Sequence, residues 1–102
     1  MKIEIPFNDW SKERLRLLVK TATSRNKKYG NVGDTFEVDG CEYELTLVIK
    51  LPLWFVAECL WSYEGAFHYA EFVDVWNSMH PKKNYEDNEN LMVWYHHFRK
   101  VK

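Results

Sequence analysis

Lys-Thr-Ala-Thr-Ser-Arg, at Lys20–Arg25, is the stretch around which the rest of the chain is arranged. It carries two cations and three hydroxyl groups but no bulky side chain that is purely apolar, and it lies between an amphipathic helical pattern and a glycine-containing loop. A segment that served only packing would carry larger apolar groups. We therefore expect Lys20–Arg25 to form the floor of a small polar cleft.

Before this stretch, the sequence predicts a short strand and a helix. Isoleucines alternate with charged residues over Met1–Pro6, which is typical of a strand. A helix is expected over Asp9–Val19, with Asn8 as its N-cap. The residues near helical spacing are Trp10, Arg14, Leu17 and Leu18. Because Arg14 interrupts this apolar stripe, we expect its stem to lie along the edge of the core with its charged group in water.

The residues that follow indicate another short strand and a β-hairpin. Thr21–Ser24 is β-prone, and a polar loop with two glycines separates it from strands predicted at Thr35–Val38 and Cys41–Lys50. Asp39-Gly40 between these two strands is a strong type I′ turn signal. In the second strand, alternate residues form one apolar face, which we expect to be buried. These residues are Cys41, Tyr43, Leu45, Leu47 and Ile49.

The rest of the chain predicts two helices and a closing strand. Pro52 opens a helical pattern that runs to about Trp61, and Tyr69–Met79 has an apolar stripe at helical spacing. A charged loop and a β-rich strand over Leu91–Arg99 follow. Strands from both ends of the chain with helices between them indicate the α+β class. We expect a single domain over residues 1–102, built as a small β-barrel or a strongly curved mixed sheet with three flanking helices.

The composition is that of a globular protein, with 46% hydrophobic and 28% charged residues and a net charge of −1. Residues 1–30 hold eight Lys or Arg against three Asp or Glu, so this part of the chain is basic. The basic residues either form a rim around the cleft or are scattered over a solvated surface. The five Trp, six Tyr and six Phe either fill a small core or include one or two that line a pocket for a planar ligand.

The two cysteines, Cys41 and Cys59, are eighteen residues apart and have no metal-ligand spacing. We expect both to be small buried hydrophobic residues in a reducing compartment. No apolar run has the length of a signal peptide or a membrane span. The sequence therefore predicts a cytoplasmic protein that does not associate with a membrane.

A set of segments, taken in order, resembles one known family. The segments are Lys20–Arg25, Gly33-Asp34, Glu64-Gly65, Phe72–Trp76, His80–Lys83 and Val93–Phe98. Together they resemble the ASCH domain, a branch of the PUA-like β-barrel superfamily, over about residues 8–99. The resemblance implies a barrel with a cleft that binds RNA or a nucleotide. The chain departs from the family pattern at Leu18, where many members have glycine, so the turn into Lys20 has to form without a residue that readily adopts positive φ.

The resemblance also implies a catalytic site. A sub-branch of the family consists of small amidohydrolases that act on acetylated cytidine, and their lysine, threonine and glutamate correspond here to Lys20, Thr23 and Glu64. Other members are ribonucleases, and others have no known chemistry. Thr23 would be the nucleophile, Lys20 the base and Glu64 the proton shuttle, with Arg25 lowering the pKa of the lysine. Because Lys20 and Thr23 would point to opposite faces of a regular strand, catalysis requires a bend where the strand begins.

Binding without catalysis explains the same residues. Lys20 and Arg25 could clamp a phosphate or a carboxylate. Thr21 and Thr23 could be ordinary strand residues, and Glu64 could be a helix-end residue that faces water. Whether the protein is an enzyme is therefore left open by the sequence.

Other residues extend the candidate binding site. Loop residues Lys27, Lys28 and Tyr29 could contact a nucleic-acid backbone. One of the adjacent pair His96 and His97 could reach the cleft from the last strand, and we take His97 as the candidate. The candidate ligand-binding residues are Lys20, Thr21, Arg25, Lys28, Tyr29 and His97. The histidines and cysteines lack metal-ligand spacing, so we expect no metal and no cofactor. The expected partner of a monomeric protein is RNA, a nucleotide or a nucleoside.

Overall fold

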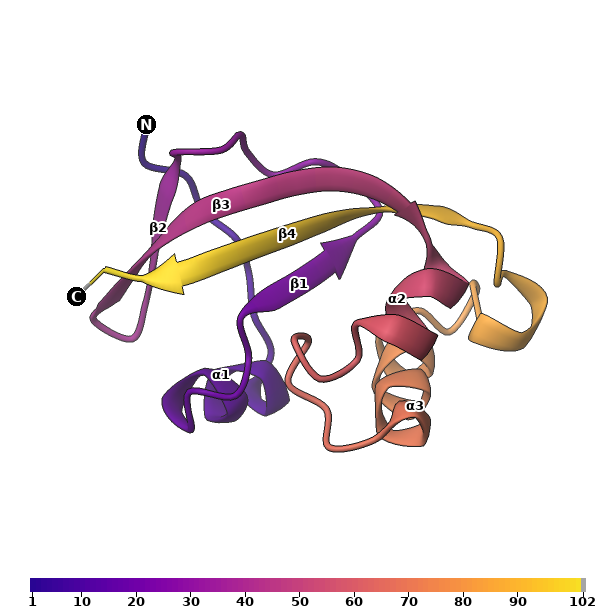
Figure 1. The fold of residues 1–102 in the computed structure, drawn as a ribbon. Helices are drawn as coiled ribbons and strands as arrows, with labels where there is room; N and C mark the ends of the chain where they lie inside the picture. Colours follow the sequence, from indigo (N-terminus) through magenta and orange to yellow (C-terminus); the bar gives the residue numbers. More distant parts are fainter. Residues whose placement is uncertain (102) are drawn as a thin grey trace.

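The computed structural model describes residues 1–101, which form one sheet and three α-helices. The elements in chain order are α1 (Asp9–Arg16), β1 (Ala22–Arg25), β2 (Thr35–Val38), β3 (Cys41–Pro52), α2 (Leu53–Cys59), α3 (Tyr69–Met79), a 3-10 turn (Tyr85–Asp87) and β4 (Met92–Lys100). β3 and β4 arch over the helices, with α1 beneath one part of the sheet and α2 and α3 beneath the other (Figure 1). The helices within residues 1–101 are each too short or too polar to cross a lipid bilayer.

The strands form an antiparallel sheet in the order β1-β4-β3-β2. β4 lies between β1 and β3, so the segment Lys20–Arg25 runs beside the end of the chain. Asp39 and Gly40 have φ values of 50° and 85°, as a type I′ turn requires. The predicted α+β class with three helices and a strongly curved sheet is confirmed, and the curved sheet of the described residues is an antiparallel half-barrel.

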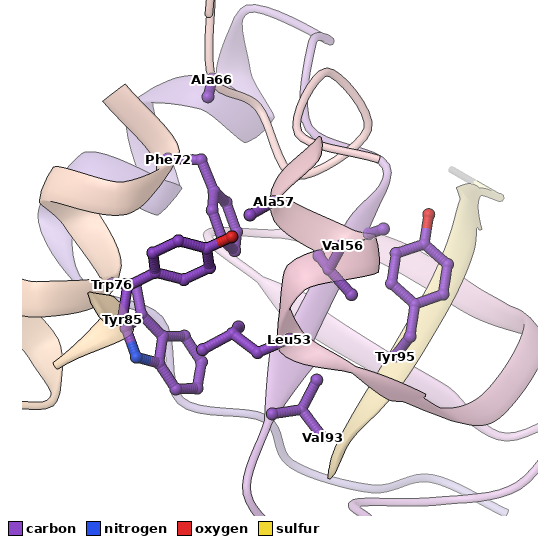
Figure 2. Close-up of a cluster of buried hydrophobic side chains, with 10 residues drawn as sticks. Leu53, Val56, Ala57, Ala66, Phe72, Trp76, Tyr85, Val93 and Tyr95 are labelled. Atoms are coloured by element: carbon purple, nitrogen blue, oxygen red, sulfur yellow. The ribbon is translucent and has the colours of Figure 1, made fainter. Parts of the chain in front are cut away.

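The hydrophobic core consists of two clusters that pack against different parts of the sheet. Val93 and Tyr95 point to one face of β4, and Phe98 points to the other. The first cluster packs α2 and α3 against β4 (Figure 2) and comprises Ala22, Leu53, Val56, Ala57, Ala66, Phe72, Trp76, Tyr85, Val93 and Tyr95. The second cluster packs α1 against the hairpin and comprises Ile5, Leu15, Phe36, Val38, Tyr43, Leu45 and Phe98.

A bulge in β3 changes which side chains are buried. Tyr43 and Leu45 are buried as predicted, but the register with β4 shifts between Leu45 and Leu47. One extra residue reverses the alternation of side chains, so Leu47 and Ile49 are exposed and their predicted burial is wrong. Val48 packs against the second cluster instead.

The inward face of α1 also differs from the prediction. Leu17 and Leu18 are exposed, so their predicted place in the apolar stripe is wrong. Leu15 and Arg14 are buried, and the guanidinium of Arg14 lies inside the protein rather than in water. A buried guanidinium is tolerated here because a carboxylate, that of Glu71, lies 2.8 Å from it.

α1 ends in a turn that requires a left-handed residue. Its last residue is Arg16, and Leu18 has a φ of 62°. The N–H of Val19 donates to the carbonyl of Arg14, and the N–H of Leu18 donates to that of Leu15, which is the hydrogen-bond pattern of a Schellman cap. The turn therefore forms in the conformation that glycine adopts easily, although the residue in the left-handed position is Leu18.

Two smaller predictions are wrong as well. Met1–Pro6 forms no regular strand in the part of the chain that the structure describes, since Lys2 makes only an isolated parallel bridge to Thr35. The cysteines are not fully buried, because Cys41 is half-buried and Cys59 is exposed. Both are free thiols.

Candidate functional site

A pocket lies at the edge strand β1, between α1 and α3. The polar residues that line it are Ser11, Lys20, Thr23, Ser24, Arg25 and Glu64. Its aromatic and apolar walls are Trp10, Phe72, Val75, Trp76, Met79 and His80. Its cavity volume is about 30 Å³, so the side chains leave little free space between them. A polar cleft built on Lys20–Arg25 is therefore present, and Glu64 belongs to it.

Lys20 reaches the pocket because it lies in the turn before β1. The strand begins at Ala22, and the N–H of Lys20 donates to the carbonyl of Arg14 in the last turn of α1, at 3.3 Å. Lys20 therefore does not follow the alternation of the strand, and its side chain lines the same pocket as that of Thr23. Lys20 is 4% exposed and Thr23 is 3% exposed. The bend that catalysis would require is present.

The ammonium of Lys20 contacts the loop after α2. Its Nζ donates to the carbonyl of Glu64 at 2.8 Å and lies 3.7 Å from the carboxylate Oε1 of the same residue. Burial lowers the pKa of Lys20 to about 8; the carboxylate of Glu64 opposes this shift and the charge of Arg25 adds to it. A fraction of Lys20 is consequently neutral near pH 8 and can accept a proton.

Glu64 enters the pocket because the next residue is a glycine. Gly65 has a φ of 100°, and a Cβ there would lie 3.0 Å from the Cβ of Lys20 and 3.1 Å from that of Arg14. This close approach lets the carboxylate of Glu64 turn inward, where its Oε2 accepts a hydrogen bond from the hydroxyl of Ser24 at 2.7 Å. Glu64 is 5% exposed, so the alternative in which it faces water is wrong.

Arg25 holds the hydroxyl of Thr23. Its Nε donates to Oγ1 of Thr23 at 3.0 Å, and its Nη2 donates to the carbonyl of Pro6 at 2.6 Å. The guanidinium carbon also lies 5.0 Å from the ring centre of Phe7. Because the threonine oxygen accepts a bond from a cation, its own proton remains available for a ligand or a base.

An aromatic pair forms part of the α3 side of the pocket. The rings of Trp76 and His80 are stacked with their centres 3.7 Å apart, and Nδ1 of His80 lies 3.1 Å from the carbonyl of Trp76. Burial lowers the pKa of His80, and the charge of Arg25 contributes to the same shift. The imidazole is therefore neutral at pH 7 and offers a flat surface, while Trp10 lines the pocket from α1.

Four of the predicted ligand-binding residues lie outside this lining: Thr21, Lys28, Tyr29 and His97. Tyr29 is next to the pocket, since the guanidinium of Arg25 lies 5.4 Å from its ring centre. His97 packs against Tyr63, with ring centres 5.4 Å apart. Lys20 and Arg25 line the pocket, as does the predicted catalytic trio. The ligand-binding and catalytic roles of all these residues stay predictions.

Sequence reasoning placed four of the twelve lining residues in the site and missed the other eight, which are Trp10, Ser11, Ser24, Phe72, Val75, Trp76, Met79 and His80. Ser24 was in the quoted stretch, and its bond to Glu64 could not be found without knowing that the loop after α2 approaches β1. The sequence places Trp10 only in the apolar stripe of the first predicted helix, and His80 only in a segment that resembles the family. No local sequence signal identifies them, because Trp10 lies in the first turn of α1, at its far end from the stretch, and His80 follows α3 much further along the chain. Residues 1–101 contain no group of three His, Cys, Asp or Glu side chains that could hold a metal ion.

No family model matches the sequence, and no curated protein is significantly similar to it. Among solved structures, the fold is similar to that of an ASCH domain from Lactobacillus crispatus, with a TM-score of 0.69, 16% identity, and coverage of 98% of this chain and 78% of the other. It is also similar to protein PF0455 from Pyrococcus furiosus, with a TM-score of 0.65, 12% identity, and coverage of 100% and 99%. A third similar structure is protein EF3133 from Enterococcus faecalis, with a TM-score of 0.65, 22% identity, and coverage of 99% and 80%.

These similarities confirm the resemblance at the level of the fold. The chain has the α+β half-barrel fold of ASCH domains. A shared fold does not fix a reaction or a ligand, so function has to be argued from the pocket.

Proposed function

We propose that the pocket binds one nucleoside or nucleotide unit, free or at an exposed position in an RNA strand. The observation that carries this proposal is the gathering of Lys20, Arg25 and Glu64 between aromatic walls. A base is planar and has donors and acceptors along its edge, so aromatic walls and a mixed polar floor complement it.

The pocket is narrow, since its cavity volume of about 30 Å³ is far below the roughly 300–1,000 Å³ of small-molecule sites. Binding of a base would therefore require the walls on α1 and α3 to move apart, and a single unit needs less opening than a strand. The polar floor carries both signs of charge, since the carboxylate of Glu64 lies among Lys20 and Arg25. Such a floor suits a neutral base or nucleoside better than a run of phosphates.

Hydrolysis of an amide on a nucleoside is the second candidate, and the lowered pKa of Lys20 favours it. Neutral Lys20 would accept the proton of the Thr23 hydroxyl as its oxygen attacks the acyl carbon. Glu64 would then relay this proton to the departing amine, and water would hydrolyse the acyl ester on Thr23 to release the acid. The bond from Arg25 to the threonine oxygen would stabilise negative charge on that oxygen during attack.

We favour binding over hydrolysis because the ammonium of Lys20 is directed at the loop and not at Thr23. Its Nζ donates to the carbonyl of Glu64, and no hydrogen bond joins it to Thr23 among the described residues. Proton transfer from Thr23 therefore requires Lys20 to leave this carbonyl or to act through a water molecule.

The test is a panel of nucleosides and nucleotides, including acetylated cytidine, titrated by calorimetry and followed for products by chromatography. We expect Lys20→Met and Thr23→Val to weaken binding about tenfold, which corresponds to about 1.4 kcal/mol. Thr46→Val is the matched control, because it removes an exposed hydroxyl that donates to the carbonyl of His97 on β4. Turnover that is lost in Thr23→Val would add catalysis to binding.

Two outcomes would contradict the proposal. One is the absence of binding to every member of the panel at millimolar concentration. The other is an affinity that stays unchanged in Lys20→Met. An oligonucleotide whose binding does not depend on salt and survives Lys20→Ala with Arg25→Ala would exclude RNA contact at this pocket.

A further inference from the structure

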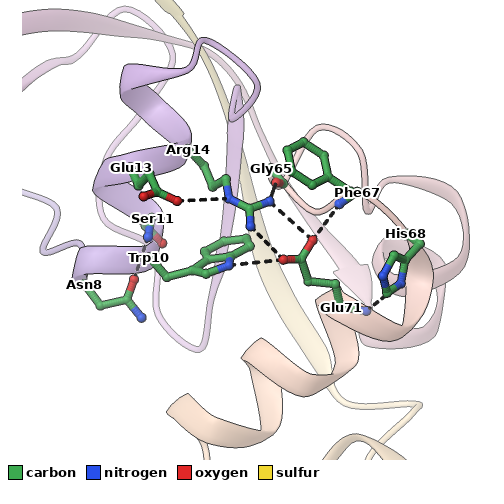
Figure 3. Close-up of polar contacts among 9 residues, drawn as sticks. All are labelled: Asn8, Trp10, Ser11, Glu13, Arg14, Gly65, Phe67, His68 and Glu71. Atoms are coloured by element: carbon green, nitrogen blue, oxygen red, sulfur yellow. Dashed lines mark hydrogen bonds and ion pairs between the residues drawn. The ribbon is translucent and has the colours of Figure 1, made fainter.

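Arg14 is the centre of a buried polar cluster that joins three parts of the protein (Figure 3). Its Nη1 donates to the carbonyl of Gly65 at 2.9 Å, and its Nη2 donates to the carboxylate of Glu71 at 2.8 Å. Glu71 also accepts a bond from the N–H of Phe67 at 2.7 Å and one from Nε1 of Trp10 at 3.4 Å. We call these five residues the clamp.

The clamp connects the two sides of the pocket. Trp10 and Arg14 belong to α1, Glu71 belongs to α3, and Gly65 and Phe67 belong to the loop between α2 and α3. The guanidinium of Arg14 also lies 4.7 Å from the ring centre of Trp10 and 4.3 Å from that of Phe67. The guanidinium of Arg14 and the carboxylate of Glu71 thus bridge α1 and α3.

The clamp and the pocket hold neighbouring atoms of the same loop. The carbonyl of Gly65 accepts from Arg14 at 2.9 Å, and the preceding carbonyl, that of Glu64, accepts from Lys20 at 2.8 Å. The backbone carbonyl of Arg14 in turn accepts from the N–H of Lys20 at 3.3 Å. Arg14 therefore contacts both segments that carry the ionisable pair of the pocket.

We propose that Arg14 is a positioning residue for the pocket: together with Glu71 it presses the Glu64-Gly65 loop against Lys20 and keeps water away from the lysine ammonium. This role rests on the proposed function, because it prepares Lys20 and Glu64 for a ligand that they would contact. Arg14 itself does not line the pocket.

The physical reason is that the burial of Lys20 depends on the loop. Gly65 lies so close to Lys20 that even a Cβ at this position would be 3.0 Å from that of Lys20. The bonds of Arg14 and Glu71 hold the loop from the side of α1 and α3. On the side of β1 it is held by Lys20 and Ser24, which donate to Glu64, and by two backbone N–H groups that donate to the carbonyl of Tyr63. If the clamp is broken, water enters beside Lys20 and its charged form is favoured.

Electrostatics alone predicts that loss of Glu71 shifts the pKa of Lys20 in the opposite direction, downward. The charged or titratable groups that face it from the elements packed around it are Arg14 on α1, Arg25 on β1, Tyr43 on β3, Lys100 on β4, Glu64 in the loop, and Glu71 and His80 on α3. Removing the carboxylate of Glu71 would by electrostatics alone lower the pKa of Lys20, because an anion is lost. Opening of the loop would raise it, so the direction of the shift separates the two effects.

The experiment is an NMR titration of Lys20 Nζ in the full chain without ligand, using protein labelled at lysine. We expect Glu71→Ala to raise the pKa of Lys20 from about 8 by about one unit or more. Arg14→Lys, which keeps the charge but not the two-pronged geometry, is expected to raise it by a smaller amount. A pKa that is unchanged or lowered in Glu71→Ala overturns the proposal.

Two control variants exclude simpler explanations. Glu13→Ala removes an exposed carboxylate that lies 4.0 Å from Nε of Arg14, and it is expected to leave the titration of Lys20 unchanged. Val56→Ala destabilises the first cluster and leaves the clamp residues in place, so the pKa of Lys20 is again expected to stay unchanged. A raised pKa in Val56→Ala would mean that any loss of stability exposes Lys20. If Glu71→Ala does not fold, Glu71→Gln replaces it in the titration, because glutamine keeps the shape of the side chain and weakens its bond to Arg14.

The titration needs no ligand, so it separates the two proposals. If no nucleoside binds and the pKa of Lys20 still rises in Glu71→Ala, the proposed function fails and the positioning role stands. If nucleosides bind and their affinity and the pKa of Lys20 are both unaffected by Glu71→Ala, the positioning role fails alone.

Discussion

Two neighbouring cations, Arg14 and Lys20, are both buried, but their contacts with carboxylates differ. Arg14 is 9% exposed and Lys20 is 4% exposed, and each donates to one of two consecutive carbonyls in the Glu64-Gly65 loop. Arg14 has a close carboxylate partner, Glu71, at 2.8 Å. Lys20 has its carboxylate partner at 3.7 Å and a pKa lowered to about 8.

This difference distinguishes a structural cation from one that is available to a ligand. A buried charge with a close, bidentate partner stays ionised and joins elements together. A buried charge with a longer contact keeps part of its bonding capacity and can change its protonation state. The three predictions that follow test this distinction, from the largest expected effect to the smallest.

Replacing each cation by methionine should separate the two roles. Arg14→Met leaves the carboxylate of Glu71 and the carbonyl of Gly65 without their donor, so we expect the free energy of unfolding to fall by about 3 kcal/mol. Lys20→Met leaves the buried carboxylate of Glu64 without its cation, but this contact is longer and Ser24 still donates to the carboxylate, so we expect a smaller loss of about 1–2 kcal/mol. Urea denaturation of both variants measures the difference. Equal losses of stability would remove the distinction.

The turn that connects the two cations can be stabilised without moving either. Leu18 is exposed and has a φ of 62°, a conformation that costs a leucine about 1 kcal/mol or more. We expect Leu18→Gly to raise the free energy of unfolding by about 0.5–1 kcal/mol, because this gain is partly offset by the greater freedom of the unfolded chain. Leu17→Gly, at an exposed neighbour with a φ of −79°, should lower it instead. A loss of stability in Leu18→Gly would show that this leucine packs in solution.

A buried histidine extends the comparison to a neutral group. His96 is fully buried, its Nε2 accepts from the N–H of Tyr29 at 3.1 Å, and its Nδ1 lies 3.2 Å from the carbonyl of Thr23. Burial lowers the pKa of His96 below its ordinary value of 6.5. As the pH falls below about 6.5, the unfolded chain binds a proton that the folded protein does not, so stability decreases.

The size of this effect is a few tenths of a kcal/mol at pH 6. Urea denaturation at pH 7.5 and pH 6 should show the decrease, and His96→Gln should make it smaller. The decrease should not vanish, because burial also lowers the pKa of His80 and His97. An equal decrease in His96→Gln would mean that His96 does not contribute.

The fold could be predicted where one local pattern determines one element. The apolar stripe of Tyr69–Met79 and the Asp39-Gly40 turn gave the right helix and the right hairpin. The end of α1 could not be predicted in the same way. It depends on Leu18 adopting a left-handed conformation that leucine disfavours locally, and contacts elsewhere have to compensate.

The pocket was predictable in part for a similar reason. Lys20, Thr23 and Arg25 lie in one short polar stretch, and the resemblance to a family added Glu64 from forty residues further on. The clamp gave no such signal. Arg14 looked like a solvent-facing interruption of an apolar stripe, because its partner Glu71 is brought to it by the packing of α3 and not by any local sequence pattern.

The bulge in β3 has a consequence for how relatives of this chain are recognised. The strand supplies Tyr43 and Leu45 to one face before the bulge and Val48 after it, so its hydrophobic residues change phase halfway along. An alignment that follows alternation alone would open a gap near Thr46 or pair buried positions with exposed ones in every residue after it. A relative that lost this one residue would keep the hairpin but would need a new set of side chains along the rest of the strand.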